Sequence, residues 1–305
     1  YITQQCDGTP AGKTTIPPKK AIDEQQSAIY AENCFPKFDT QGNLIDTSKH
    51  SDDKIVLGYT YDGLPFQIIV DGAYGLDNTQ RQKFFKFIDD SVSAHIDQYA
   101  RDLADTTKNE QAVTYEFIKQ VNAKREDRIH FTMAIAVTYE RDGQLKCAGF
   151  GIGNNAIVLR RKTGQIEQLV TNNKYNNDNK DAFDNYTFSR FDTPYLIARN
   201  SFFTTTVQEQ DELVAYTSLP KEREESASQF CTKIIHQDKT FDIEDIQKFK
   251  LCPPKRTSPL FTALVEERST IYEQRKQNKT ARGDDASFGQ IFVPNPELRN
   301  KLKQA

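Results

Sequence analysis

The pattern of apolar and polar positions begins with two short, mostly apolar runs that predict a β-hairpin. The runs cover residues 54–59 and 66–70, and Asp62-Gly63 between them is a hairpin turn signal. The second run ends in Asp71-Gly72, which is typical of a buried strand that delivers a carboxylate to its C-terminal end. Asp53 stands at the start of the first run. Antiparallel pairing folds these two ends onto one edge of a sheet, so Asp53 and Asp71 are expected side by side.

The rest of the apolar pattern predicts helices that are segregated from antiparallel strands. Apolar side chains at three- and four-residue steps predict helices over residues 79–104 and 110–124, with Asn78 and Thr79 placed to cap the first. Further strands are predicted over residues 131–139, 145–153, 156–161, 166–170, 195–207, 212–219 and 288–293, and a long helix over residues 258–277. The strands between residues 131 and 170 are expected to form a meander. This order predicts an α+β fold, a layered α-β-β-α sandwich of antiparallel sheets flanked by helices.

Polar segments suggest the domain limits. Residues 1–40 predict an irregular N-terminal arm, and residues 41–305 a single domain. The chain begins at Tyr1 without a Met, so we expect a fragment of a longer protein. The Asn-rich segment 172–185 predicts an exposed loop. Glycines at 149, 151 and 153 do not form a dinucleotide loop, because strands and not a helix follow them, and they instead predict close sheet packing or a bulge.

Composition excludes several classes of function. A net charge of −3 gives no reason to expect a nucleic-acid partner. No apolar run approaches the roughly 20 residues of a membrane span, so no transmembrane segment is expected. The five cysteines are an odd number, widely spaced and without a CxxC pair, which favours reduced structural thiols. The four histidines form no zinc-binding pattern.

The acidic residues at strand ends are the candidate chemistry. Two carboxylates brought together repel each other unless a cation or a proton lies between them. Asp284-Asp285 opens the last predicted strand and adds a third acidic point, which fits a carboxylate-lined metal site. The alternative is that Asp53 and Asp71 are two solvated loop acids.

Five stretches, taken in order, resemble motifs of the PP2C-type metal-dependent protein phosphatase family. They are Asp52-Asp53, Val70-Asp71-Gly72-Ala73-Tyr74-Gly75, Gly153-Asn154-Asn155-Ala156-Ile157-Val158-Leu159, Ala215-Tyr216-Thr217-Ser218-Leu219 and Asp284-Asp285-Ala286-Ser287. The resemblance covers about residues 50–293. The chain departs from it where Asn154 and Thr217 replace aspartates, the second of them a metal ligand, and where Ala73 and Tyr74 replace His-Gly.

The resemblance implies two metal ions, Mg²⁺ or Mn²⁺, held by oxygen ligands. Asp71 would bridge the ions, the Gly72 carbonyl would ligate one of them, and Asp53 would bind through a water. Asp284 would complete the set, with Asp285 as the alternative because the register is uncertain by one residue. The implied catalytic residues are therefore Asp53, Asp71 and Asp284.

Within this family the chain is most similar to bacterial effectors that remove AMP from a tyrosine of a Rab-type small GTPase. The resemblance thus implies a metal-dependent hydrolase that de-AMPylates such a GTPase in the host cytosol, acting as a monomer. Two alternatives remain open. One is a Ser/Thr protein phosphatase of PP2C type, and the other is a PP2C-like binding module without catalysis, which the changes at Asn154 and Thr217 favour.

Overall fold

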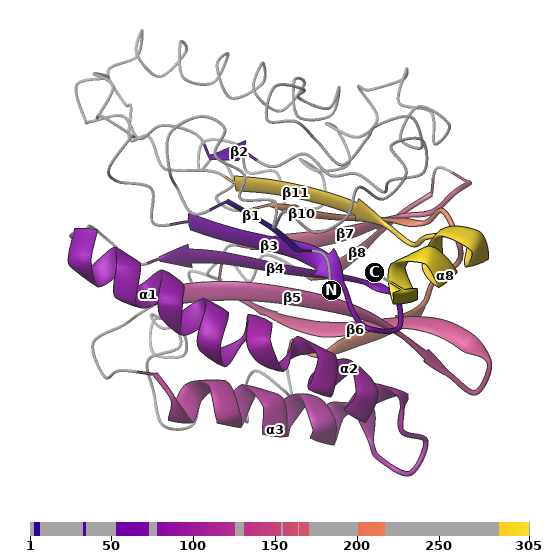
Figure 1. The fold of residues 1–305 in the computed structure, drawn as a ribbon, viewed down its shortest axis with the longest axis horizontal. Coiled ribbons are helices and arrows are strands. Elements are labelled where there is room, and N and C mark those ends of the chain that lie inside the picture. Colours follow the sequence, from indigo (N-terminus) through magenta and orange to yellow (C-terminus); the bar gives the residue numbers. More distant parts are fainter. Residues whose placement is uncertain are drawn as a thin grey trace, which may run out of the picture.

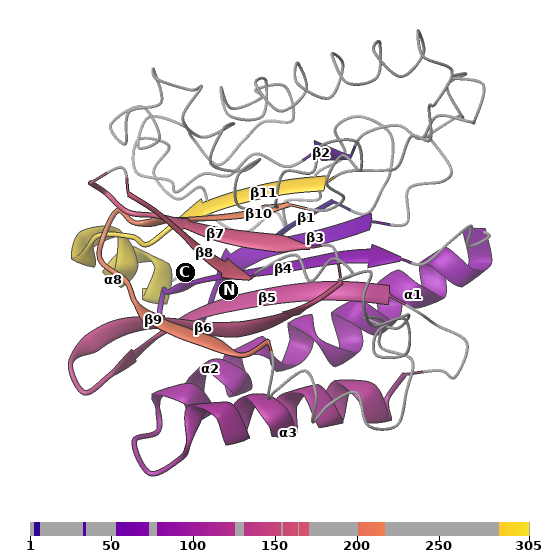
Figure 2. The same cartoon turned by 180° about the vertical axis from the view of Figure 1, so that it is seen from behind.

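The computed structural model describes residues 3–6, 33–34, 53–72, 78–125, 131–153, 155–163, 165–170, 201–216 and 287–304. In this part of the chain two antiparallel sheets lie face to face, and three helices cover the outer face of one sheet (Figures 1 and 2). The expected α+β sandwich is therefore confirmed. The helix expected over residues 258–277 and the loop expected over residues 172–185 lie outside the described residues.

Each sheet contains strands from widely separated parts of the chain. The first sheet has the order β1 (Thr3–Cys6), β3 (Asp53–Tyr59), β4 (Pro65–Gly72), β5 (Phe131–Arg141), β6 (Gln144–Ile152) and β9 (Phe203–Thr206). The second has the order β2 (Asn33–Cys34), β11 (Ser287–Phe292), β10 (Glu212–Tyr216), β7 (Ala156–Arg160) and β8 (Ile166–Val170). Within the segment expected as an irregular arm, residues 3–6 and 33–34 are described, and they form β1 and β2, each of which pairs at the edge of a sheet.

The predicted hairpin forms, and its turn chemistry explains why. Gly63 has a φ of +67°, a left-handed conformation that glycine adopts without strain. The Gly63 N–H donates to the Thr60 carbonyl at 2.8 Å, and the Thr60 N–H donates to the Leu64 carbonyl at 2.9 Å. These bonds set the register in which Asp53 pairs with Asp71.

Alternation along β4 separates two buried faces. Phe66, Ile68 and Val70 belong to the core cluster that packs against the helices. Gln67 points the other way, because its Nε2 donates to the Leu213 carbonyl of β10 at 2.7 Å. Asp71 shares the alternation of Gln67 and therefore lies on the face between the two sheets.

The helical layer differs from the prediction at one point. The single helix expected over residues 79–104 is two helices, α1 (Asn78–Ser91) and α2 (Ile96–Ala104), joined by a 3₁₀ turn over Ser93–His95. His95, the last residue of this turn, leaves helical geometry with φ of −106° and ψ of 1°. Ser91, Val92 and Ser93 are weak helix formers, so the helix breaks where its propensity is lowest.

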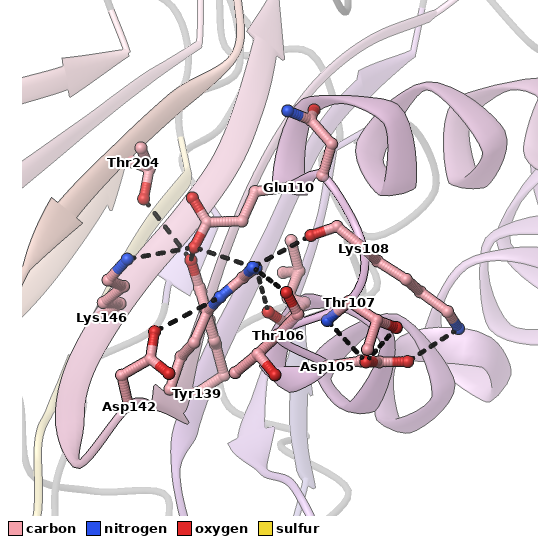
Figure 3. A network of polar contacts seen from close by, with 12 residues as sticks. Asp105, Thr106, Thr107, Lys108, Glu110, Tyr139, Asp142, Lys146 and Thr204 are labelled. Carbon is pink, nitrogen blue, oxygen red and sulfur yellow. Dashed lines mark hydrogen bonds and ion pairs between the residues drawn. The ribbon is translucent and has the colours of Figure 1, made fainter.

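The second predicted helix is α3 (Glu110–Ala123), and Asn109 caps it by accepting from the Ala112 N–H at 3.0 Å. A polar network joins its first residue to the β5–β6 turn (Figure 3). Glu110 accepts from the Tyr139 hydroxyl at 2.7 Å and from Lys146 Nζ at 3.3 Å. Burial alone would raise the pKa of the Glu110 carboxyl, but these donors and the charge of Arg141 hold it below its ordinary value.

The strands between residues 131 and 170 form two hairpins and not one meander. The β5–β6 hairpin lies in the first sheet and the β7–β8 hairpin in the second. The prediction of a single meander was therefore wrong, because the chain crosses between sheets after Gly153, which has a φ of +88°. The polar tail also contains a helix that the pattern missed, α8 (Pro296–Gln304).

The glycines of β6 permit close packing, as expected. A Cβ at Gly151 would lie 2.0 Å from Val170 Cγ1 on β8, which is too close for any real contact. We expect Gly151→Ala to destabilise the protein by about 1–3 kcal/mol, because the extra methyl overpacks the space between the sheets. The double variant Gly151→Ala/Val170→Ala should recover part of this loss in chemical denaturation. Equal stability of the single variant and the wild type would contradict the close contact.

Candidate metal site

Two aspartates lie directly opposite each other at one end of the first sheet. Asp53 on β3 pairs with Asp71 on β4, and residues paired in this way have Cβ atoms roughly 4.5–5.5 Å apart on the same face. Asp53 is buried, with 1 % of its surface exposed, and Asp71 is half-buried. Both belong to strands, so they are not two solvated loop acids. Carboxylates at this depth require compensating partners.

Lys54, the residue after Asp53, contacts the helices on the opposite face of the sheet. Lys54 follows Asp53 and is almost fully buried. Its Nζ lies 2.7 Å from Asp89 Oδ1 and donates to the Phe85 carbonyl at 3.2 Å, both on α1. Lys54 therefore ties α1 to β3 on the helical side, while Asp53 and Asp71 face the second sheet.

Asp53, Asp71 and Thr132 form one row across β3, β4 and β5, and Thr132 adds a hydroxyl to it. Thr132 on β5 pairs with Asp71 and shares its face. Asn155, which precedes β7, donates from Nδ2 to Thr132 Oγ1 at 3.0 Å. Gly153 also lies against Thr132, because a Cβ added at Gly153 would lie 2.2 Å from Thr132 Cγ2. The structure thus brings the Gly153 motif beside Asp53 and Asp71, two stretches that are far apart in the sequence.

The ends of the two sheets therefore coincide at this row. Ala156 opens β7 directly after Asn155 and pairs with Tyr216, the last residue of β10. Tyr216 also pairs with Phe288 near the start of β11. The remaining residues of the expected site adjoin these strand ends in sequence but lie outside the described residues: Ala73, Tyr74, Asn154, Thr217, Asp284 and Asp285. Their placement stays a prediction.

The donors present fit a divalent cation. The two aspartates supply carboxylate oxygens, and the Gly72 carbonyl comes from the same strand end, which are the hard ligands that Mg²⁺ and Mn²⁺ prefer. The buried Asn155 Oδ1 has no hydrogen-bond partner in the described part of the chain, and a buried amide oxygen of this kind is normally hydrogen-bonded. Within the described residues no group of three or more His, Cys, Asp or Glu side chains gathers, and Asp284 and Asp285 are not among these residues.

Sequence reasoning missed Thr132 and gave no role to Asn155. Thr132 is a polar residue near the start of an otherwise apolar strand, which is the one signal that could have marked it. Its relation to Asp71 depends on the register of β4 against β5, which no local pattern fixes.

Cys147 can be set aside as a nucleophile. Its side chain is fully buried on β6, and burial raises the pKa of its thiol to about 12. Such a thiol stays protonated near neutral pH and is unreactive. This agrees with the structural role expected for it.

In the described residues, none of the helices has both the length and the apolar character needed to cross a bilayer.

The solved structures that this fold resembles are phosphatase domains. One is the SpoIIE phosphatase domain of Bacillus subtilis, with a TM-score of 0.43 and 11% identity over 90% of this chain and 95% of that one. A SpoIIE fragment with part of its regulatory domain has a TM-score of 0.49 and 13% identity over 88% and 65% of the two chains. The catalytic domain of the serine/threonine phosphatase PstP, in complex with 2 manganese ions, has a TM-score of 0.45 and 9% identity over 88% and 99%.

Comparison of the sequence itself is more specific. No curated protein sequence matches the chain. A family model described as "SidD, catalytic domain" matches residues 1–298, which is nearly the whole chain.

Proposed function

Because this chain belongs to the SidD catalytic-domain family, we propose that it removes AMP from a tyrosine of a Rab-type small GTPase. The match to a catalytic-domain family and the PP2C-like fold support a hydrolase, and the resemblance described above implies a bacterial effector that acts on a protein substrate. The modified residue, the GTPase and the phosphodiester bond are the proposed part. We further propose that the chain acts as a monomer in the host cytosol, and that residues 41–305 form its catalytic domain, to whose sheets β1 and β2 of the preceding segment add edge strands.

The observation that carries the proposal is the pairing of Asp53 with Asp71 between the sheets. A protein that only binds a partner has no physical reason to keep two repelling carboxylates side by side, one of them buried. A cation between them removes this repulsion. The pairing therefore favours catalysis over the binding module that Asn154 and Thr217 suggest.

The residues that would hold two Mg²⁺ or Mn²⁺ ions are Asp53, Asp71, the Gly72 carbonyl, and Asp284 or Asp285. When bound, such ions lower the pKa of a water near neutrality and offset negative charge on phosphoryl oxygens. Asp53 and Asp71, fixed on neighbouring strands, would hold the ligand geometry without rearrangement.

The bond changes are those of phosphodiester hydrolysis. A bond forms between a water oxygen and phosphorus, and the bond between phosphorus and the tyrosine oxygen breaks. One proton of the water ends on the tyrosine oxygen, and the other stays on the phosphate of AMP or passes to solvent, so the products are the unmodified tyrosine side chain of the protein and AMP. A phenol of pKa ~10 is an adequate leaving group without a strong general acid. A diester substrate carries one negative charge, so the site has less substrate charge to offset. This fits a site in which Thr217 replaces a metal-binding aspartate.

The test is mass spectrometry of an AMPylated Rab protein incubated with this chain, with and without Mg²⁺. We expect loss of one AMP mass only when metal is present, leaving unmodified tyrosine. A parallel incubation with phosphoserine and phosphothreonine peptides tests the Ser/Thr phosphatase alternative. Release of phosphate from the peptides without loss of AMP would favour that alternative, and no reaction in either incubation would favour the binding module.

A further inference from the structure

The candidate metal site contains one polar group that its carboxylates do not explain. The Asn155 side chain is fully buried between the sheets, directly before β7. Its Nδ2 donates to Thr132 Oγ1 at 3.0 Å, while its Oδ1 has no hydrogen-bond partner in the described part of the chain. Burying an amide oxygen without a partner is costly, so a donor that the described residues do not supply is expected to reach it.

Thr132 connects this amide to the carboxylates. It pairs with Asp71 across β4 and β5, so the two side chains lie on the same face and within contact distance of each other. Gly153, directly after β6 of the same sheet, lies close to Thr132, because a Cβ added at Gly153 would lie 2.2 Å from Thr132 Cγ2. The Thr132 hydroxyl therefore accepts from Asn155, and the Thr132 side chain lies on the same face of the sheet as Asp71.

We propose that Thr132 and Asn155 are positioning residues for the metal site of the proposed hydrolase. Asn155 fixes the Thr132 hydroxyl beside Asp71, and Asn155 Oδ1 accepts a hydrogen bond from an ordered water of the loaded site. The inference rests on the proposed function, because it assigns these residues to the same cation. Both side chains are neutral, so they orient Asp71 without competing with it for the cation's charge. Groups that orient a ligand in this way typically change metal affinity by about 10- to 100-fold.

The test is isothermal titration of the metal-free protein with Mn²⁺. Thr132→Val removes the hydroxyl with little change in shape, and Asn155→Leu removes the amide. Each is expected to weaken Mn²⁺ affinity by about tenfold. Thr132→Ser keeps the hydroxyl and should bind Mn²⁺ as the wild type does. Thr138→Val is the matched control, because Thr138 is a buried threonine on the same face of β5, paired with Cys147 away from Asp71.

The possible outcomes separate this inference from the proposed function. Wild-type affinity in both Thr132→Val and Asn155→Leu, together with lost binding in Asp71→Ala, would overturn the positioning role and leave the metal site intact. Absence of Mn²⁺ binding in the wild type would overturn both proposals. Equal weakening in Thr138→Val and Thr132→Val would show a general effect on packing and would also overturn the positioning role. If Asn155→Leu does not fold, as circular dichroism would show, the comparison of Thr132→Val with Thr132→Ser decides.

Discussion

Asp71→Ala is expected to abolish removal of AMP while leaving the fold intact. If Asp71 bridges two ions, its loss removes the ligand that both share, and we expect kcat/KM to fall by about 10³-fold or more, which corresponds to ~4 kcal/mol of transition-state stabilisation. Stability should change little. Asp53 and Asp71 repel each other in the metal-free protein, and removing one carboxylate relieves that repulsion. The measurements are kcat/KM on the AMPylated GTPase and the thermal midpoint of unfolding without metal.

Asp142→Asn is the matched control, because it removes a carboxylate far from the candidate metal site. Asp142 lies in the exposed β5–β6 turn with a φ of +53°, a conformation that asparagine also tolerates. Asp142→Asn should therefore keep both full activity and stability. Turnover of Asp71→Ala equal to the wild type would rule out a bridging role, and a large fall in its metal-free stability would mean that Asp71 mainly supports the fold.

The parts of the site that could be predicted from sequence are those fixed by local signals. The Asp62-Gly63 turn sets the register of the two apolar runs, so the position of Asp53 opposite Asp71 followed from the hairpin alone. The same holds for the β5–β6 hairpin, where Asp142 and Gly143 both have left-handed conformations. In these cases one turn, a few residues long, decides which side chains meet.

The errors arose where the outcome depends on contacts between distant segments. The apolar runs over residues 131–170 read as one meander because periodicity does not indicate which sheet a strand joins. β1 lacks any apolar pattern and is a strand because the edge of β3 offers unpaired backbone groups. Thr132 and Asn155 lie 23 positions apart in the sequence. They meet only because β5 and β7 belong to facing sheets.

Removal of divalent metal should stop the reaction completely, and Mn²⁺ or Mg²⁺ should restore it. After treatment with EDTA and buffer exchange, we expect no AMP release above the uncatalysed rate. The described donors of the site are carboxylate and carbonyl oxygens. Cys147 pairs with Thr138, away from Asp71, and is buried with the pKa of its thiol raised to about 12, so it does not substitute for a metal-activated water.

Binding of the added metal should also raise the stability of the folded protein. Mn²⁺ that binds only the folded protein raises the free energy of unfolding, by about 2.7 kcal/mol when the free Mn²⁺ concentration is 100 times the dissociation constant. The thermal midpoint of unfolding should rise accordingly. The rise should be absent in Asp71→Ala, which lacks the shared ligand, and present in Asp142→Asn. Full turnover in the presence of EDTA would contradict metal-dependent hydrolysis. In that case the burial of Asp53 opposite Asp71 would have to be explained by a proton shared between the two carboxyl groups.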